Sequence, residues 1–178
     1  MNNDENNIQR LIGRLEAEDN RNTIMFKVLR IIFLLLVLLY FVQGVVHYVD
    51  DRNLFEALGY AAFVIAFSIA FLLMNKHVEI YSRVDYSLPT LKMLKQARLR
   101  YRIFPSRATG YIVALLSFVT IAQIFNAWDS VEDQIILIPI FFGSLVLGLL
   151  IGCAFWIIRD KPIYDKLNEM IRDLESDV

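Results

Sequence analysis

The sequence predicts an all-α, polytopic membrane protein with four transmembrane helices, both termini in the cytoplasm and short amphipathic cytoplasmic helices. Of its 178 residues, 57% are hydrophobic and 21% are charged, and the two kinds are segregated along the chain. Four stretches contain no Asp, Glu, Lys or Arg: 31–49, 57–75, 110–128 and 135–158. Each is about as long as a helix must be to cross a hydrocarbon core ~30 Å thick at ~1.5 Å per residue. These stretches exclude an ordinary soluble domain.

The basic residues predict the orientation of these spans. Of the 18 Lys and Arg residues, 17 precede the first stretch, lie between the second and third, or follow the fourth. Only Arg52 lies in a short connection, and both short connections carry acids such as Asp50 and Asp133. Lys and Arg accumulate in the cytoplasmic loops of membrane proteins. We therefore expect both termini in the cytoplasm and the two short loops outside.

The same pattern divides the chain into five segments. We expect a cytoplasmic amphipathic helix within 1–24 and a first transmembrane hairpin in 25–75. A basic cytoplasmic loop with its own amphipathic helix follows in 76–109. The second transmembrane hairpin occupies 110–158, and a C-terminal amphipathic helix occupies 159–178.

The three cytoplasmic segments each carry apolar residues at helical spacing. The polar run 19–22 predicts an interruption after the first stripe, and Lys161-Pro162 suits the start of a new helix. Such stripes pack on one another, lie in the lipid interface or await a partner. They comprise Ile8, Leu11, Ile12 and Leu15; Leu91, Leu94, Ala97, Tyr101 and Phe104; and Ile163, Leu167, Met170, Ile171 and Leu174.

Both outer turns place a capping side chain three residues ahead of an acid. Asn53 precedes Glu56, and Ser130 precedes Asp133. In a capping box these side chains satisfy the free N–H groups of the first helical turn, and the acid is favoured by the helix dipole. The alternative is a divalent-cation site, although neither loop has the ligand spacing of a calcium loop. The shared plan of the two hairpins leaves duplication open.

The middle cytoplasmic loop carries a basic cluster that is a candidate lipid- or partner-binding site. No acid occurs between Tyr86 and Trp128. A basic helix beside a membrane is attracted to anionic lipid by ~1 kcal/mol per residue. Three interpretations stay open: a helix lying on the inner leaflet, a determinant of orientation only, and a docking site for an acidic protein. The cluster comprises Lys92, Lys95, Arg98, Arg100, Arg102 and Arg107.

Two spans carry small residues spaced four apart, which favours close approach of helix backbones in lipid. We expect the second span to pack on the fourth within one chain. A homodimer formed through the Gly148 face is the alternative, so the chain is also a candidate homo-oligomer. The residues are Ala62, Ala66 and Ala70 in the second span, and Ser144, Gly148 and Gly152 in the fourth.

Polar side chains within the spans gather toward the outer ends. Gln43 and His47 share one face of the first span, and Gln123 and Asn126 share one face of the third. At similar depths they could hydrogen-bond across the bundle or line a small polar pocket that opens outward.

The chain shows no motif for catalysis, and we expect no enzyme activity, cofactor or metal. The spans hold no Asp, Glu, Lys or Arg, which argues against a pump or an ion-coupled transporter. His47 and His77 lie near opposite membrane faces and cannot share a metal. The single cysteine, Cys153, cannot form an internal disulfide. Tyr101 and Phe104 fit an apolar stripe better than a platform for bases, so we expect no nucleic-acid binding.

Residues 80–85 (Ile-Tyr-Ser-Arg-Val-Asp) and the basic helix 91–101 that follows resemble a pattern in uncharacterised small four-span inner-membrane proteins encoded beside extracytoplasmic-function sigma factors. The resemblance implies a multi-pass protein of the bacterial inner membrane whose cytoplasmic segments contact a partner. We therefore expect a non-enzymatic interaction, scaffold or regulatory protein. The alternative is a small oligomeric channel or transporter subunit with an outer polar vestibule.

Overall fold

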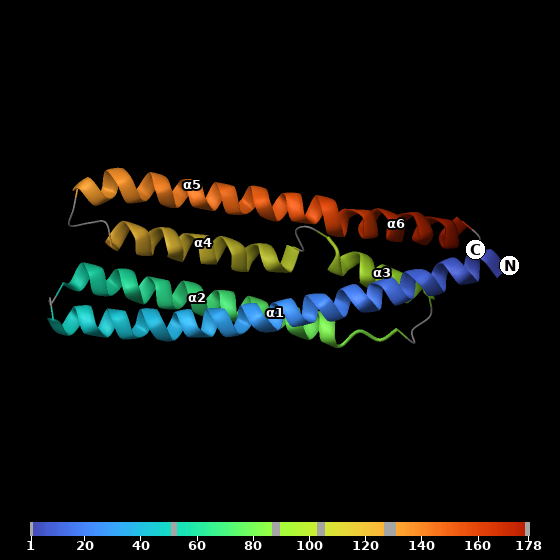
Figure 1. Ribbon diagram of the computed structural model, residues 1–178, viewed down its shortest axis with the longest axis horizontal. Helices are drawn as coiled ribbons and strands as arrows, with labels where there is room; N and C mark the ends of the chain where they lie inside the picture. Colours follow the sequence, from blue (N-terminus) through green and yellow to red (C-terminus); the bar gives the residue numbers. More distant parts are fainter. Residues whose placement is uncertain (1, 51–52, 87–89, 103–105, 127–130, 177–178) are drawn as a thin grey trace.

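The computed structural model describes residues 2–50, 53–86, 90–102, 106–126 and 131–176, and the regular elements in these ranges are helices (Figure 1). Four of the helices are long and apolar enough to cross a membrane. The all-α class with four helices of spanning length is therefore confirmed. The elements are α1 (Asn2–Asp50), α2 (Leu54–Ser82), α3 (Thr90–Arg100), α4 (Ser106–Asn126), α5 (Val131–Phe155), a π-helical turn (Trp156–Asp160) and α6 (Lys161–Ser176).

The apolar helices lie side by side in one layer (Figure 1). α1 packs along α2, α2 packs along α4, and α4 touches α5 over a small area. A third of the most apolar window of α2 is consequently buried, whereas none of the window in α5 is. The four spans therefore form an open row in chain order rather than a closed bundle.

Small residues give α2 its place inside this row. Ala62, Ala66 and Ala70 are buried, and a Cβ atom on Gly59 would overlap Asn126 Oδ1 of α4. Close backbone approach of this kind holds helices together in lipid, where burial supplies no hydrophobic drive. The expected packing of the second span on the fourth is wrong, since α2 uses these residues against α1 and α4.

Figure 1 places both chain termini at one end of the molecule, here called the terminal end, and the α1–α2 and α4–α5 connections at the other, the loop end. At the terminal end the first part of α1, α3 and α6 form a small three-helix unit, the terminal bundle. Its buried core consists of Leu11, Leu15, Met93, Leu94, Ala97, Tyr101, Ile163, Leu167 and Ile171.

The terminal bundle decides between the three expectations for the amphipathic stripes. The apolar stripes of α1, α3 and α6 pack on one another. For the residues of this core, the two alternatives, burial in lipid and burial by a partner, are therefore wrong. α3 runs along the direction of the long helices rather than across it (Figure 1). Phe104 and the side chain of Ile8 lie outside the described residues.

α1 is one continuous helix of 49 residues, about 73 Å long at ~1.5 Å per residue. The interruption expected at 19–22 does not occur. Thr23 Oγ1 donates to the Asp19 carbonyl oxygen at 2.8 Å, and Asn22 and Asp19 are buried among polar partners. Polar residues disfavour a helix when they compete for its backbone, and here tertiary contacts engage them instead.

α5 also continues without a break into α6, so the helix expected to start afresh at Lys161-Pro162 is instead the end of a rod. The Lys161 N–H donates to the Trp156 carbonyl oxygen, five residues back. Proline has no N–H and its ring clashes with the carbonyl four residues earlier. A widened π-helical turn directly before Pro162 accommodates both effects and keeps the rod continuous.

The first predicted cap is confirmed. The side chain of Asn53 accepts hydrogen bonds from the N–H groups of Phe55, at 3.0 Å, and Glu56, at 3.3 Å. The second predicted cap involves Ser130 and the side chain of Asp133, which lie outside the described residues.

Candidate functional site

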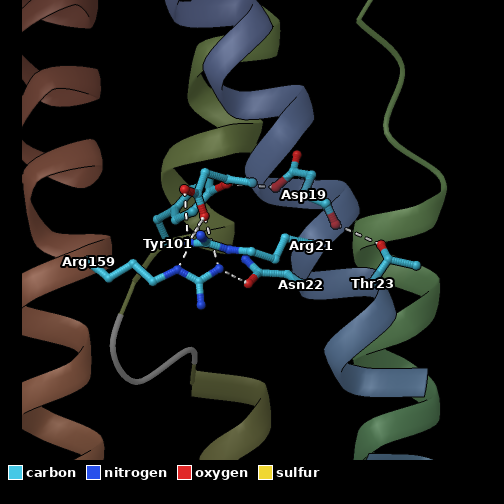
Figure 2. Close-up of polar contacts among 7 residues, drawn as sticks. Asp19, Arg21, Asn22, Thr23, Tyr101 and Arg159 are labelled. Atoms are coloured by element: carbon cyan, nitrogen blue, oxygen red, sulfur yellow. Dashed lines mark hydrogen bonds and ion pairs between the residues drawn. The ribbon is translucent and has the colours of Figure 1, made fainter. Parts of the chain in front are cut away.

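A buried carboxylate, Asp19, holds together the region where the terminal bundle meets the long helices. It lies on α1 with 2% of its surface exposed. Its Oδ1 accepts from the Tyr101 hydroxyl at 2.8 Å (Figure 2). Its Oδ2 accepts from the Tyr86 hydroxyl at 2.7 Å. Arg100 Nη2 donates to the same Oδ2 at 3.0 Å. A buried charge needs such partners, because desolvation without them costs several kcal/mol.

The two tyrosines are fixed as hydrogen-bond donors. Burial raises the pKa of Tyr101 well above its usual range, and the negative charge of Asp19 raises it further. Burial and the hydrogen bond to Asp19 likewise raise the pKa of Tyr86. Both hydroxyls therefore keep their protons at physiological pH. A carboxylate that faces two phenols and one guanidinium is suited to positioning the elements that carry them.

A second ion pair ties the α5–α6 rod to the same stretch of α1. Arg159, in the π-helical turn, donates from Nη2 to Glu18 Oε2 at 2.9 Å and also donates to Asn22 Oδ1 (Figure 2). Arg159 and Glu18 each have 17% of the side chain exposed. Hydrogen bonds to charged groups are stronger than neutral ones, especially away from water. α1 and the rod are thus joined where α3 also meets them.

The C-terminal end of α3 is capped by two other helices. The last carbonyl groups of a helix lack partners within it. The Tyr81 hydroxyl of α2 donates to the Arg100 carbonyl oxygen at 3.1 Å. Trp156 Nε1 of the π-helical turn donates to the Tyr101 carbonyl oxygen at 3.0 Å. α1, α2, α3 and the rod therefore meet in one set of contacts, which we call the junction cluster: Glu18, Asp19, Asn22, Tyr81, Tyr86, Arg100, Tyr101, Trp156, Arg159 and Asp160.

Two buried polar atoms of the junction cluster have no hydrogen-bond partner among the described residues. They are Arg100 Nε and Asp160 Oδ1. Burial raises the pKa of the Asp160 carboxyl, Glu18 adds to the rise, and Arg159 opposes it. An unpaired buried acceptor costs free energy, so the Asp160 carboxyl is destabilising in its ionised form.

The predicted basic cluster is divided between protein contacts and open surface. Lys95 Nζ lies 2.6 Å from Glu175 of α6, Arg98 reaches Asn168, and Arg100 is held by Asp19. Lys92 and Arg102 are exposed. The side chain of Arg107 lies outside the described residues.

The four residues of the predicted polar pocket do not form one cavity. His47 Nδ1 lies 3.5 Å from Glu56 of α2, and the imidazole stacks on Tyr60. Asn126 faces Gly59, on the part of α2 that packs against α4. Gln43 is exposed on α1, and Gln123 is half-buried on α4. α2 therefore lies between Gln43 and His47 of α1 on one side and Gln123 and Asn126 of α4 on the other.

Within the described part of the chain, no other helix lies against the small residues of α5. Ser144, Gly148 and Gly152 are exposed, and a Cβ atom on either glycine would have no neighbour within 4 Å. Ala62, Ala66 and Ala70 of α2 are buried as described above. The homodimer expected through Gly148 stays a prediction.

Sequence reasoning missed the junction cluster, although one signal for it was present. Leu11, Leu15 and Asp19 follow one another at intervals of four, so the acid continues the apolar face of α1. An acid on a buried face requires a partner. Its partners could not be found by spacing, because Tyr86 and Tyr101 lie 67 and 82 residues away.

Comparisons with protein-family profiles, with curated proteins and with solved structures gave no match. Within the described residues, no group of three or more His, Cys, Asp or Glu side chains is arranged to hold a metal ion.

Proposed function

We propose that this protein is a non-enzymatic integral membrane protein that acts through the terminal bundle as an interaction, scaffold or regulatory protein. The observation that carries the proposal is the junction cluster. It joins α1, α2, α3 and the α5–α6 rod at the base of the long helices. The buried Asp19–Arg100 pair would then fix how the bundle sits on the spans, since setting the register of packed elements is the best-attested use of buried polar groups.

The distribution of charge supports a cytoplasmic location for the bundle. The 17 basic residues outside the short loops all precede the first charge-free stretch, lie between the second and third, or follow the fourth. By the positive-inside rule the terminal end lies in the cytoplasm and both short loops lie outside. The resemblance of residues 80–101 supports the inner membrane of a bacterium and a regulatory role.

The outer face of α3 is the surface that we assign to a partner. Lys92, Gln96 and Leu99 follow one another at intervals of four and three, so they share one face, and all are exposed. Leu99 has 61% of its surface exposed, and Arg102 lies exposed just beyond the helix. An apolar side chain with two exposed cations on the same side of the bundle suits an acidic protein partner with a small apolar recess. Anionic lipid headgroups are the other candidate for these two cations.

The test is a crosslinked pull-down from native membranes followed by mass spectrometry. The variant Lys92→Gln, Leu99→Ser, Arg102→Gln changes only exposed residues and leaves Lys95, Arg98 and Arg100 to their contacts within the chain. The matched control, Lys166→Gln with Arg172→Gln, removes two exposed basic residues from α6.

A cytoplasmic protein that is captured by the wild type and the α6 control, and lost with the α3 variant, would support the proposal. Equal capture by all three proteins would contradict the assignment of the α3 face. If only self-crosslinks form, the interaction role is wrong, and the oligomeric channel becomes the function to test. Flux in liposomes that disappears in a Gln43→Leu, Gln123→Leu variant would support that alternative.

A further inference from the structure

A groove lies between α1 and α2 in the half of these helices nearer the loop end. Its volume is about 460 Å³, which falls within the ~300–1,000 Å³ of small-molecule sites. Both helices contribute residues at helical spacing, from Tyr40 to Tyr48 on α1 and from Ala57 to Ile65 on α2. Each lining segment is nine residues long, so the groove extends along the helix axes for roughly 12 Å.

Small side chains create this groove and aromatic ones border it. Gly44 allows α1 to approach Tyr60 closely, since a Cβ atom at Gly44 would lie 2.9 Å from the Tyr60 Cβ. Ala57 and Ala61 line the side formed by α2. Phe41 and Tyr48 line the side formed by α1, and both are more than half exposed.

The position of the groove limits what can occupy it. The lining residues fall within the charge-free stretches 31–49 and 57–75, which we place in the hydrocarbon region. An elongated apolar groove at this depth is accessible to lipid chains. Tyrosine is enriched where hydrocarbon meets headgroups, and Tyr48 lies two residues from the end of α1. A lipid would therefore place its headgroup beside Tyr48 and extend its chain toward Phe41.

The charges at the loop end select the headgroup. α1 ends at Asp50, and Glu56 lies in the first turn of α2. The imidazole of His47 lies against Glu56 and stacks on Tyr60, which itself lines the groove. Residues 51–52 add one acid and one base, so the loop end stays net negative. An ammonium group is attracted to this end, whereas a headgroup with net negative charge is repelled.

We propose that the α1–α2 groove binds one acyl chain of a zwitterionic phospholipid with an ammonium headgroup, of the phosphatidylethanolamine type. The site is independent of the terminal bundle. Failure of this proposal leaves the proposed function unaffected.

The test uses the full chain in nanodiscs of mixed phosphatidylethanolamine and phosphatidylglycerol with a trace of photoactivatable phosphatidylethanolamine. Labelled residues are mapped by mass spectrometry. Ala61→Trp fills the groove, and Ala61→Leu is a smaller filler in case the tryptophan variant does not fold. The matched control is Val113→Trp on α4, where Val113 is 58% exposed and lies outside the groove.

We expect the label to concentrate on the groove residues in the wild type and in Val113→Trp, and to fall about tenfold in Ala61→Trp, the change expected from a loss of ~1.4 kcal/mol of binding. Photoactivatable phosphatidylglycerol should label the groove less than phosphatidylethanolamine does. Label spread evenly over the exposed residues of all four spans, or unchanged by Ala61→Trp, would overturn the site. Equal or stronger labelling by phosphatidylglycerol would overturn the assignment of the headgroup.

Discussion

Asp19 shows at the scale of single residues how one polar group can organise helices from distant parts of the chain. Its side chain is 3% exposed and that of Arg100 is 8% exposed, so the ion pair is almost fully removed from water. Two tyrosine hydroxyls satisfy further lone pairs of the carboxylate. Removal of one member would leave the others buried without a partner, and that loss is larger than the net value of the pair.

Asp19→Ala should therefore lower the free energy of unfolding by about 3–5 kcal/mol, because it leaves Arg100 as an uncompensated buried charge. Thermal unfolding in detergent, followed by intrinsic fluorescence, measures the change. Glu16→Ala is the control: Glu16 is an exposed acid on the same helix, and its removal should change stability by less than ~0.5 kcal/mol. Equal shifts in the two variants would show that Asp19 has no special role.

The raised pKa of Asp160 predicts that the stability of the protein depends on pH. Its pKa is raised above the ordinary value of 3.8, so the folded chain binds this proton more tightly than the unfolded chain does. The protonated carboxyl therefore favours the folded state at low pH, and this contribution is lost as the pH rises through the raised pKa. Asp160→Asn stays neutral throughout. Its melting temperature should be higher than that of the wild type at pH 7 and similar to it at about pH 4.

Melting temperatures of both proteins between these two pH values measure the effect. Asp165→Asn, at an exposed position of α6, controls for the removal of a negative charge. A variant that is less stable than the wild type at pH 7 would show that Asp160 has a favourable partner when ionised.

At the scale of elements, close packing rather than hairpin connectivity decides which helices pair. The α1–α2 hairpin is tightly joined, with Gly44 against Tyr60, whereas α4 and α5 touch over a small area. The two hairpins therefore differ in packing despite their similar sequence plan. α2 also packs on α4, where Gly59 receives the side chain of Asn126.

Gly59→Ala should separate α2 from α4 and destabilise the chain by about 1–3 kcal/mol, as overpacking does in other interiors. Gly143→Ala is the matched control, because nothing lies within 4 Å of a Cβ atom there. That change should leave stability unchanged or raise it by up to ~1 kcal/mol, since alanine favours a helix interior more than glycine does. Thermal unfolding in detergent compares the two variants. Equal stability would mean that the α2–α4 contact adapts without cost.

At the scale of the whole molecule, two continuous rods link the loop end to the terminal bundle. α1 and the α5–α6 rod each run from a short connection into the bundle core, and the Glu18–Arg159 pair joins them. The two rods therefore meet each other at the base of the terminal bundle, close to the C-terminal end of α3.

The orientation of these rods can be tested with single cysteines in a Cys153→Ser background. In intact cells, a membrane-impermeant maleimide should label Asp50→Cys at the loop end. Gly13→Cys and Lys166→Cys, which occupy exposed positions of the terminal bundle, should react only after the membrane is permeabilised. The parent without cysteine is the control. Labelling of Gly13→Cys in intact cells would contradict the cytoplasmic placement that the basic residues predict.

The four apolar helices and the amphipathic stripes could be predicted from sequence because both are local properties. A charge-free run of about twenty residues, or an apolar residue every third or fourth position, forms the same element wherever it packs. The cap at Asn53 is local in the same way, since its donors lie two and three residues ahead. The sequence by itself therefore determined the class of fold, the four apolar spans and the apolar faces of the amphipathic stripes.

Only the tertiary structure decided how these faces meet. The open row of spans, the mutual packing of the three stripes and the partners of Asp19 all join residues far apart in the chain. Spacing along one helix shows that Asp19 is on a buried face, but it carries no information about which tyrosine or arginine lies opposite. That choice depends on the simultaneous packing of α1, α3 and the rod. The interruption expected at 19–22 was wrong for the same reason: the partners that stabilise a continuous α1 come from other helices.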